Sequence, residues 1–169
     1  MKIRLPKNKI HVLSKIGAVF DRFSLRFSFL ICLGVKILLS GVFATLISSL
    51  FPNQLEHPIS EMPIYEAFVV VVVVAPLFET LIFQVLFFYV GEKLRINNAT
   101  IIALSSVLFA VSHHISLAYI ALTLLSGLFY NIVYLYIKER YKVSTAFLFI
   151  VGIHAIYNFV VWLNVELIK

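Results

Sequence analysis

Long apolar stretches, separated by short polar or basic segments, form the dominant pattern along this chain. A helix needs about 20 mostly apolar residues to cross the hydrocarbon core of a membrane. The third stretch is short for a span, and it runs into a tight turn at "HHISL". The expected fold class is all-α, a polytopic transmembrane helix bundle that occupies residues 27–169. The pattern predicts about five spans, over residues 27–51, 65–90, 99–114, 117–137 and 145–163.

Composition supports an integral membrane protein. Of the 169 residues, 62% are hydrophobic and only 13% are charged, whereas about a quarter of the residues in a soluble domain are charged. The chain therefore lacks the polar surface that a soluble globule of this length requires. The single cysteine, Cys32, excludes an internal disulfide framework and a multi-cysteine zinc site.

The positions of lysine and arginine predict the topology. Seven of them lie in residues 1–26, and others follow the second and fourth stretches, whereas the loop "PNQLEHPISEMPI" carries acids and no base. Because cytoplasmic loops are enriched in Lys and Arg, we expect a cytoplasmic N-terminus and a basic cytoplasmic or interfacial arm over residues 1–26. Topology and anionic lipid account for the net charge of +6, so we expect no nucleic-acid partner. Lys36 lies inside the first stretch, and we expect its ammonium to snorkel to the inner headgroups.

One carboxylate, Glu79, lies in the middle of the apolar segment "VVVVVVAPLFETLIFQ". A charged side chain at the bilayer centre costs about 2.5–3.5 kcal/mol to insert, so it normally faces the protein interior and has a partner. Pro76, three residues earlier, removes a backbone donor and favours a kink. Such a kink indicates either a cavity beside Glu79 or a bend required by packing.

Two further apolar stretches each contain a histidine that is a candidate partner for Glu79. His113 ends the third stretch one helical turn after Phe109, and His154 lies deep in the fifth stretch one turn before Asn158. Residues four apart share a helix face, so His154 and Asn158 point the same way. His114 points about 100° away from His113, and we expect it at the interface, outside any shared site.

Several kinds of site are compatible with Glu79, His113, His154 and Asn158. A buried carboxylate beside an imidazole acts as a general base on water, while imidazole and amide N–H groups stabilise an oxyanion, as in a hydrolase. Glu and His are also metal ligands and members of proton or ion relays. Isolated interhelical hydrogen bonds are the alternative without chemistry. In so apolar a chain, we favour one shared site.

The segments "APLFETLIFQ", "FAVSH" and "HAIYN" resemble, in this order, the motifs of the CPBP family of intramembrane proteases. The family includes CAAX-prenyl endopeptidases and bacterial bacteriocin-processing or immunity-related relatives, often labelled Abi. Its motifs are E-E-x-x-x-R, F-x-x-x-H and H-x-x-x-N/D, and the resemblance covers a core of about residues 75–160. It implies an endopeptidase without metal or other cofactor, in a bacterial plasma membrane. It assigns water activation to Glu79 and His113, and oxyanion stabilisation to His154 and Asn158.

The first motif departs from the family pattern. Thr80 replaces the second glutamate, and Gln84 replaces the arginine. These residues are four apart, so we expect a neutral hydrogen-bonding pair in place of a charged one. Thr80 and Gln84, with Phe109, are predicted to support the site. The departure keeps an alternative open, a non-proteolytic bacteriocin immunity or membrane scaffold protein of the same fold.

The resemblance also implies the partners. The expected substrate is a membrane-embedded or lipidated protein or peptide, reached from within the lipid bilayer. Family members often have more spans than this chain, which leaves room for a homo-oligomer that supplies a missing gate.

Overall fold

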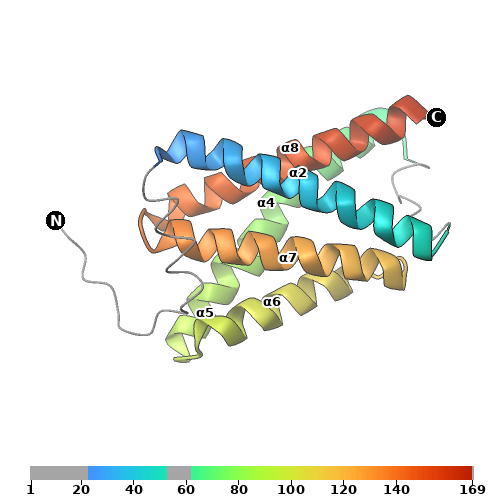
Figure 1. Ribbon diagram of the computed structural model, residues 1–169. Coiled ribbons are helices and arrows are strands. Elements are labelled where there is room, and N and C mark those ends of the chain that lie inside the picture. The colour runs from blue at the N-terminus through green and yellow to red at the C-terminus, as the bar shows by residue number, and fades with distance from the viewer. Residues whose placement is uncertain (1–22, 53–61, 169) are drawn as a thin grey trace.

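The computed structural model describes residues 23–52 and 62–168, so most of the predicted arm over residues 1–26 lies outside the described residues. The described chain consists of five helical rods and contains no strand (Figure 1). The second rod is one continuous helix of 30 residues, Ile64–Lys93, built from five segments. In chain order the elements are α2 (Leu25–Leu50), α3 (Ile64–Ala67), η2 (Phe68–Val74), α4 (Ala75–Glu79), η3 (Thr80–Leu86), α5 (Phe87–Lys93), α6 (Asn98–Ser112), α7 (Leu117–Lys138) and α8 (Val143–Ile168).

The all-α transmembrane bundle predicted from the sequence is confirmed. Four described helices, namely α2, the α3–α5 rod, α7 and α8, are long and apolar enough to cross a membrane. The third predicted span is the exception, because α6 has only 15 residues. At 1.5 Å per residue this helix is about 22 Å long, less than the roughly 30 Å of hydrocarbon.

Side chains that cap the helices set several boundaries. Asn97 Oδ1 accepts from the backbone N–H of Thr100 at 2.9 Å and starts α6, and Ser116 Oγ accepts from the N–H of Tyr119 at 3.0 Å and starts α7. Such N-caps satisfy donors that have no partner within the helix. The α3–α5 rod ends in a Schellman turn, with Arg95 at φ 57°.

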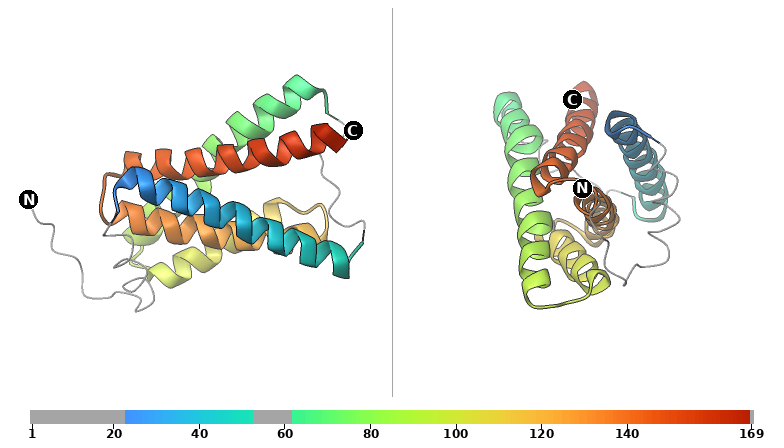
Figure 2. Two further views of the ribbon diagram at one scale, coloured as in Figure 1. Left: turned by 45° about the horizontal axis from the view of Figure 1, so that its top comes forward. Right: turned by 90° about the vertical axis from the view of Figure 1, so that its left-hand side faces the viewer.

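The helix α7 lies in the interior of the bundle, in contact with α2, α6, α8 and η3 (Figure 2). Gly127 lets α6 approach α7 closely, because a Cβ atom there would lie 3.1 Å from Phe109 Cδ1 and 3.2 Å from Ser106 Cα. The helix α8 packs against α2 and α7 on one side and against η2, α4 and η3 on the other.

Basic residues collect at one end of the bundle. The start of α2, the α5–α6 turn and the α7–α8 turn meet there, at the left of Figure 1. Lys138 of α7 and Glu92 of α5 form an ion pair of 2.5 Å at this end. The arrangement agrees with the distribution used above, and the cytoplasmic N-terminus stays a prediction. The described basic residues at this end are Arg26, Lys93, Arg95, Lys138, Arg140 and Lys142.

Candidate active site

The rod that carries Glu79 is π-helical on both sides of a short α-helical segment. The segments η2 and η3 are π-helical, and α4 lies between them. Glu79 is the last residue of α4, at the change from α to π winding. π-helical turns widen the helix, interrupt its regular hydrogen bonding and occur frequently at functional sites.

Pro76 explains one irregular bond in this rod. In η2 the N–H of Ala75 donates to the carbonyl of Val70, five residues earlier. The next such donor would be residue 76, which is proline and has no N–H. Asn158 Nδ2 from α8 donates to the carbonyl of Val71 at 2.8 Å instead. The side chain of Asn158 thus attaches α8 to the π-helical segment just before α4.

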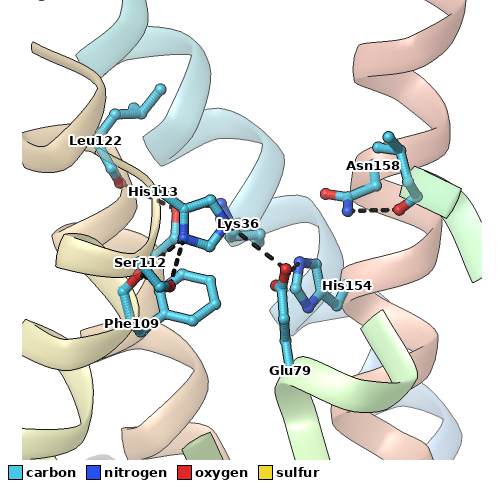
Figure 3. Close-up of polar contacts among 10 residues, drawn as sticks. Lys36, Glu79, Phe109, Ser112, His113, Leu122, His154 and Asn158 are labelled. Carbon is cyan, nitrogen blue, oxygen red and sulfur yellow. Dashed lines mark hydrogen bonds and ion pairs between the residues drawn. The ribbon is translucent and has the colours of Figure 1, made fainter. Parts of the chain in front are cut away.

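Glu79, His113 and His154 converge from three different rods (Figure 3). His113 Nε2 lies 3.6 Å from Glu79 Oε1, and His154 Nε2 lies 3.6 Å from Glu79 Oε2. Oε2 has no hydrogen-bond partner among the described residues. The side chains of Glu79 and His113 are 23% and 22% exposed, whereas that of His154 is 6% exposed. The carboxylate is therefore flanked by one accessible and one buried imidazole.

The orientation of His113 follows from its hydrogen bonds. Its Nδ1 lies 2.7 Å from the backbone carbonyl oxygen of Phe109, which can only accept, so Nδ1 carries the hydrogen. In the neutral imidazole Nε2 is then an acceptor, and it faces Glu79 Oε1, which also accepts when ionised. A separation of 3.6 Å is too long for a direct hydrogen bond and fits a bridging water that donates to both atoms.

All four residues predicted to be catalytic line a single cavity of about 320 Å³. This volume is at the lower end of the range for ligand sites. The cavity is bounded by all five rods, and most of its lining residues are apolar or aromatic. Phe109, predicted to support the site, lines the cavity as well, and its ring packs against His113 at a centroid distance of 4.6 Å. His114 is exposed and is not among the lining residues.

The expected pairing of Thr80 with Gln84 is wrong. Thr80 Oγ1 is buried and has no hydrogen-bond partner among the described residues. Gln84 Nε2 lies 3.4 Å from Asn131 Oδ1 of α7, and Asn131 Nδ2 donates to Ser105 and Ser106 of α6 at 3.2 and 3.0 Å. Gln84 finds its partner on α7 rather than on its own helix, and no described residue pairs with the hydroxyl of Thr80. We name the set Gln84, Asn131, Ser105 and Ser106 the amide cluster.

The expected snorkelling of Lys36 is also wrong. The residue is 1% exposed, and its ammonium points into the bundle. Nζ donates to Ser40 Oγ at 2.6 Å and to Ser126 Oγ at 3.0 Å, and it lies 3.6 Å from the centroid of the Tyr157 ring. Lys36 lies on the face of α2 that packs against α7 and α8, so its side chain enters the bundle instead of extending to the headgroups.

Sequence reasoning missed a set of residues on α7 that lines the cavity. Tyr130 is the most prominent, because its ring lies 4.6 Å from the His154 ring, centroid to centroid, and its hydroxyl has no partner among the described residues. The signal was present as hydroxyl-bearing residues spaced four, three and four apart, which share one helix face. They are Tyr119, Thr123, Ser126 and Tyr130.

No three His, Cys, Asp or Glu side chains in the described part of the chain are grouped so as to hold a metal ion.

Comparison with curated proteins and with solved structures returned no significant match. The model of the Rce1-like type II CAAX prenyl endopeptidases matches residues 62–160, more than half of the chain, and confirms the family resemblance. The match includes every predicted catalytic residue and excludes α2, which carries Lys36. This integral membrane protein therefore belongs to the Rce1-like family of type II CAAX prenyl endopeptidases.

Proposed function

We propose that the protein is an intramembrane endopeptidase in which Glu79 acts as the general base. The single observation that carries the proposal is the position of this carboxylate, between two imidazoles and in the wall of a cavity inside the bundle. A general base must lie within hydrogen-bond reach of the proton it removes, directly or through one water. Family membership supports peptidase activity, and the geometry supports this assignment of roles.

In the first step a water molecule bridges Glu79 Oε1 and His113 Nε2. Glu79 removes one proton from the water while the water oxygen attacks the carbonyl carbon of the substrate peptide. His113 accepts the second hydrogen bond of the water, because its Nδ1–H is fixed on the carbonyl of Phe109. The attack converts the peptide carbonyl into a tetrahedral intermediate with a negatively charged oxygen.

In the second step the intermediate collapses. His154 and Asn158 donate hydrogen bonds to the oxyanion, which is the kind of contact that contributes most to acyl-transfer catalysis. An amide nitrogen has two hydrogens; Asn158 uses one on Val71 and keeps the other for the oxyanion. The proton held by Glu79 passes to the leaving nitrogen, and the C–N bond breaks to give a carboxylic acid and an amine.

The proposed substrate is a membrane-embedded or lipidated protein or peptide. The cavity lies between helices that are apolar on their outer faces, so a substrate segment reaches it from the bilayer without first crossing a polar surface. A cavity of about 320 Å³ holds a few residues of an extended peptide rather than a folded domain.

The test compares protein and peptide termini in cells that carry the wild type, Glu79→Gln or an empty vector. Glutamine keeps the shape of the side chain and removes its basicity. We expect new termini in the wild type alone, and these identify the cleavage junction of a substrate. If the wild type produces no termini beyond those of Glu79→Gln, the peptidase proposal fails. A bacteriocin-resistance phenotype that persists in Glu79→Gln would then favour the binding alternative.

A further inference from the structure

Lys36 is an ammonium enclosed in the protein at the back of the candidate active site. Its two hydroxyl acceptors come from its own helix and from α7, and the aromatic ring beneath it, Tyr157, comes from α8. Ser126 Oγ in turn donates to the backbone carbonyl of Leu122 at 3.1 Å, so its lone pairs face the ammonium. The side chain is therefore held in one orientation from three helices.

The ammonium stands directly behind the cavity wall. Three residues that touch or face it, Ser126, Tyr130 and Tyr157, also line the cavity. The Tyr130 ring links the two groups, because its centroid lies 5.4 Å from Lys36 Nζ and 4.6 Å from the His154 ring centroid. Figure 3 shows Lys36 behind the gap between Glu79 and the imidazoles.

Lys36 has no acidic side chain in contact with it among the described residues. No other lysine or arginine among the described residues is buried, and none of the described ion pairs includes Lys36. Its contacts are two hydroxyl groups and an aromatic face, all of them neutral. In a low-dielectric interior the field of such a charge extends over neighbouring groups, and Glu79 is the carboxylate that lines the adjacent cavity.

We propose that Lys36 is a positioning residue of the active site, whose ammonium stabilises the negative charge that develops on the oxyanion during the reaction. The inference rests on the proposed peptidase function and adds to it a residue from outside the region that matches the family. The negative charge begins on Glu79 and moves to the oxyanion beside His154, on the side of the cavity where Tyr130 separates His154 from Lys36. A cation behind this wall favours the oxyanion more than the carboxylate and so lowers the barrier, without touching the substrate.

A purely structural role is the competing explanation, and energetics separates the two. Burying an ammonium costs several kcal/mol, and replacing buried charges by apolar residues of similar volume is often neutral or stabilising. A side chain that only holds α2, α7 and α8 together therefore does not need a charge. A unit charge roughly 10 Å from a developing charge, at an effective dielectric constant of about 20, changes a rate by roughly tenfold or slightly more.

The experiment measures cleavage of a quenched peptide that spans the Glu79-dependent junction, by purified full-length protein in lipid nanodiscs. The variants are Lys36→Met and Lys36→Gln, which are both neutral. The matched control is Ser40→Ala, which removes a hydroxyl that binds Lys36 and keeps the lysine. We expect both neutral variants to lower kcat about tenfold, with KM changed less than twofold and the unfolding midpoint unchanged or raised. Ser40→Ala should retain kcat within threefold.

Three results would overturn the inference. The first is a wild-type kcat in either folded neutral variant, and the second is a loss in Ser40→Ala as large as that in Lys36→Met. The third is failure of both neutral variants to fold, which would make the role of Lys36 purely structural. Failure of the peptidase proposal itself is seen earlier and separately, because the wild type then yields no junction from which to build the peptide.

Discussion

The two halves of the bundle differ in how their polar side chains are hydrogen-bonded. In the half that contains the basic turns, the residues of the amide cluster bond to one another across α6, α7 and η3. In the other half, Glu79 Oε2 has no partner among the described residues, and each imidazole stops 3.6 Å from the carboxylate. Buried polar groups are normally satisfied, so a carboxylate oxygen left without a protein partner in the wall of the cavity marks the place that is built to receive water and substrate.

This difference separates stability from chemistry. Of the two departures from the family motif, Gln84 belongs to the amide cluster and Thr80 does not line the cavity, whereas the retained motif residues Glu79, His113 and His154 line it. Substitutions in the cavity half should therefore change the rate of cleavage, and substitutions in the amide cluster should change the free energy of unfolding.

The largest effect short of removing the base is expected for His154→Ala. The substitution removes a donor to the oxyanion, and loss of one such donor typically costs a factor of 10²–10³ in kcat. We expect kcat to fall at least a hundredfold, with KM and the circular dichroism spectrum nearly unchanged. His114→Ala is the matched control, because His114 is exposed and does not line the cavity. Equal rates in both variants would contradict the proposed role of His154.

The substitution Asn131→Leu tests the amide cluster in the half of the bundle that contains the basic turns. Leucine is similar in size but leaves Gln84 and the two serines of α6 without their amide partner, and each buried unsatisfied group costs about 1–3 kcal/mol. We expect a lower free energy of unfolding in denaturant titrations, with kcat per folded molecule within threefold of the wild type. A variant that is fully stable but inactive would break the division between the two halves.

The sequence predicted the helices well and the contacts between them less well. Apolar length alone predicts four of the spans, and only α6 falls short of the expected span. The grouping of Glu79, His113 and His154 was expected because all three are polar residues in a very apolar chain, and the order of the family motifs pointed the same way. Each residue by itself indicates only a polar group in an apolar segment.

The errors have a common physical cause. The pairing of Thr80 with Gln84 assumed a contact within one helix, whereas the side chain of Gln84 turns toward Asn131 of α7. The bond from Asn158 to Val71 depends on the π winding of η2 together with Pro76. The direction of Lys36 depends on how α2 is rotated about its axis. Local winding and helix rotation are set by packing, which hydropathy does not encode.

The smallest effect is expected for Thr80→Val. Valine has nearly the shape of threonine and removes a hydroxyl that is buried without a partner among the described residues. Because a buried hydroxyl without a hydrogen bond is unfavourable, we expect a gain of about 1 kcal/mol in the free energy of unfolding and no change in kcat. A destabilised variant in the same denaturant titration would show that the hydroxyl has a partner after all.

The most direct test of the account is the cleavage rate of purified Glu79→Gln on the junction peptide, with the unfolding midpoint measured on the same sample. General-base catalysis contributes a factor of about 10²–10⁴, and the substitution also removes a charge from a partly buried site. We expect a rate at least a hundredfold below the wild type, with an unfolding midpoint equal to or above that of the wild type. A folded Glu79→Gln variant that cleaves within tenfold of the wild-type rate would contradict it.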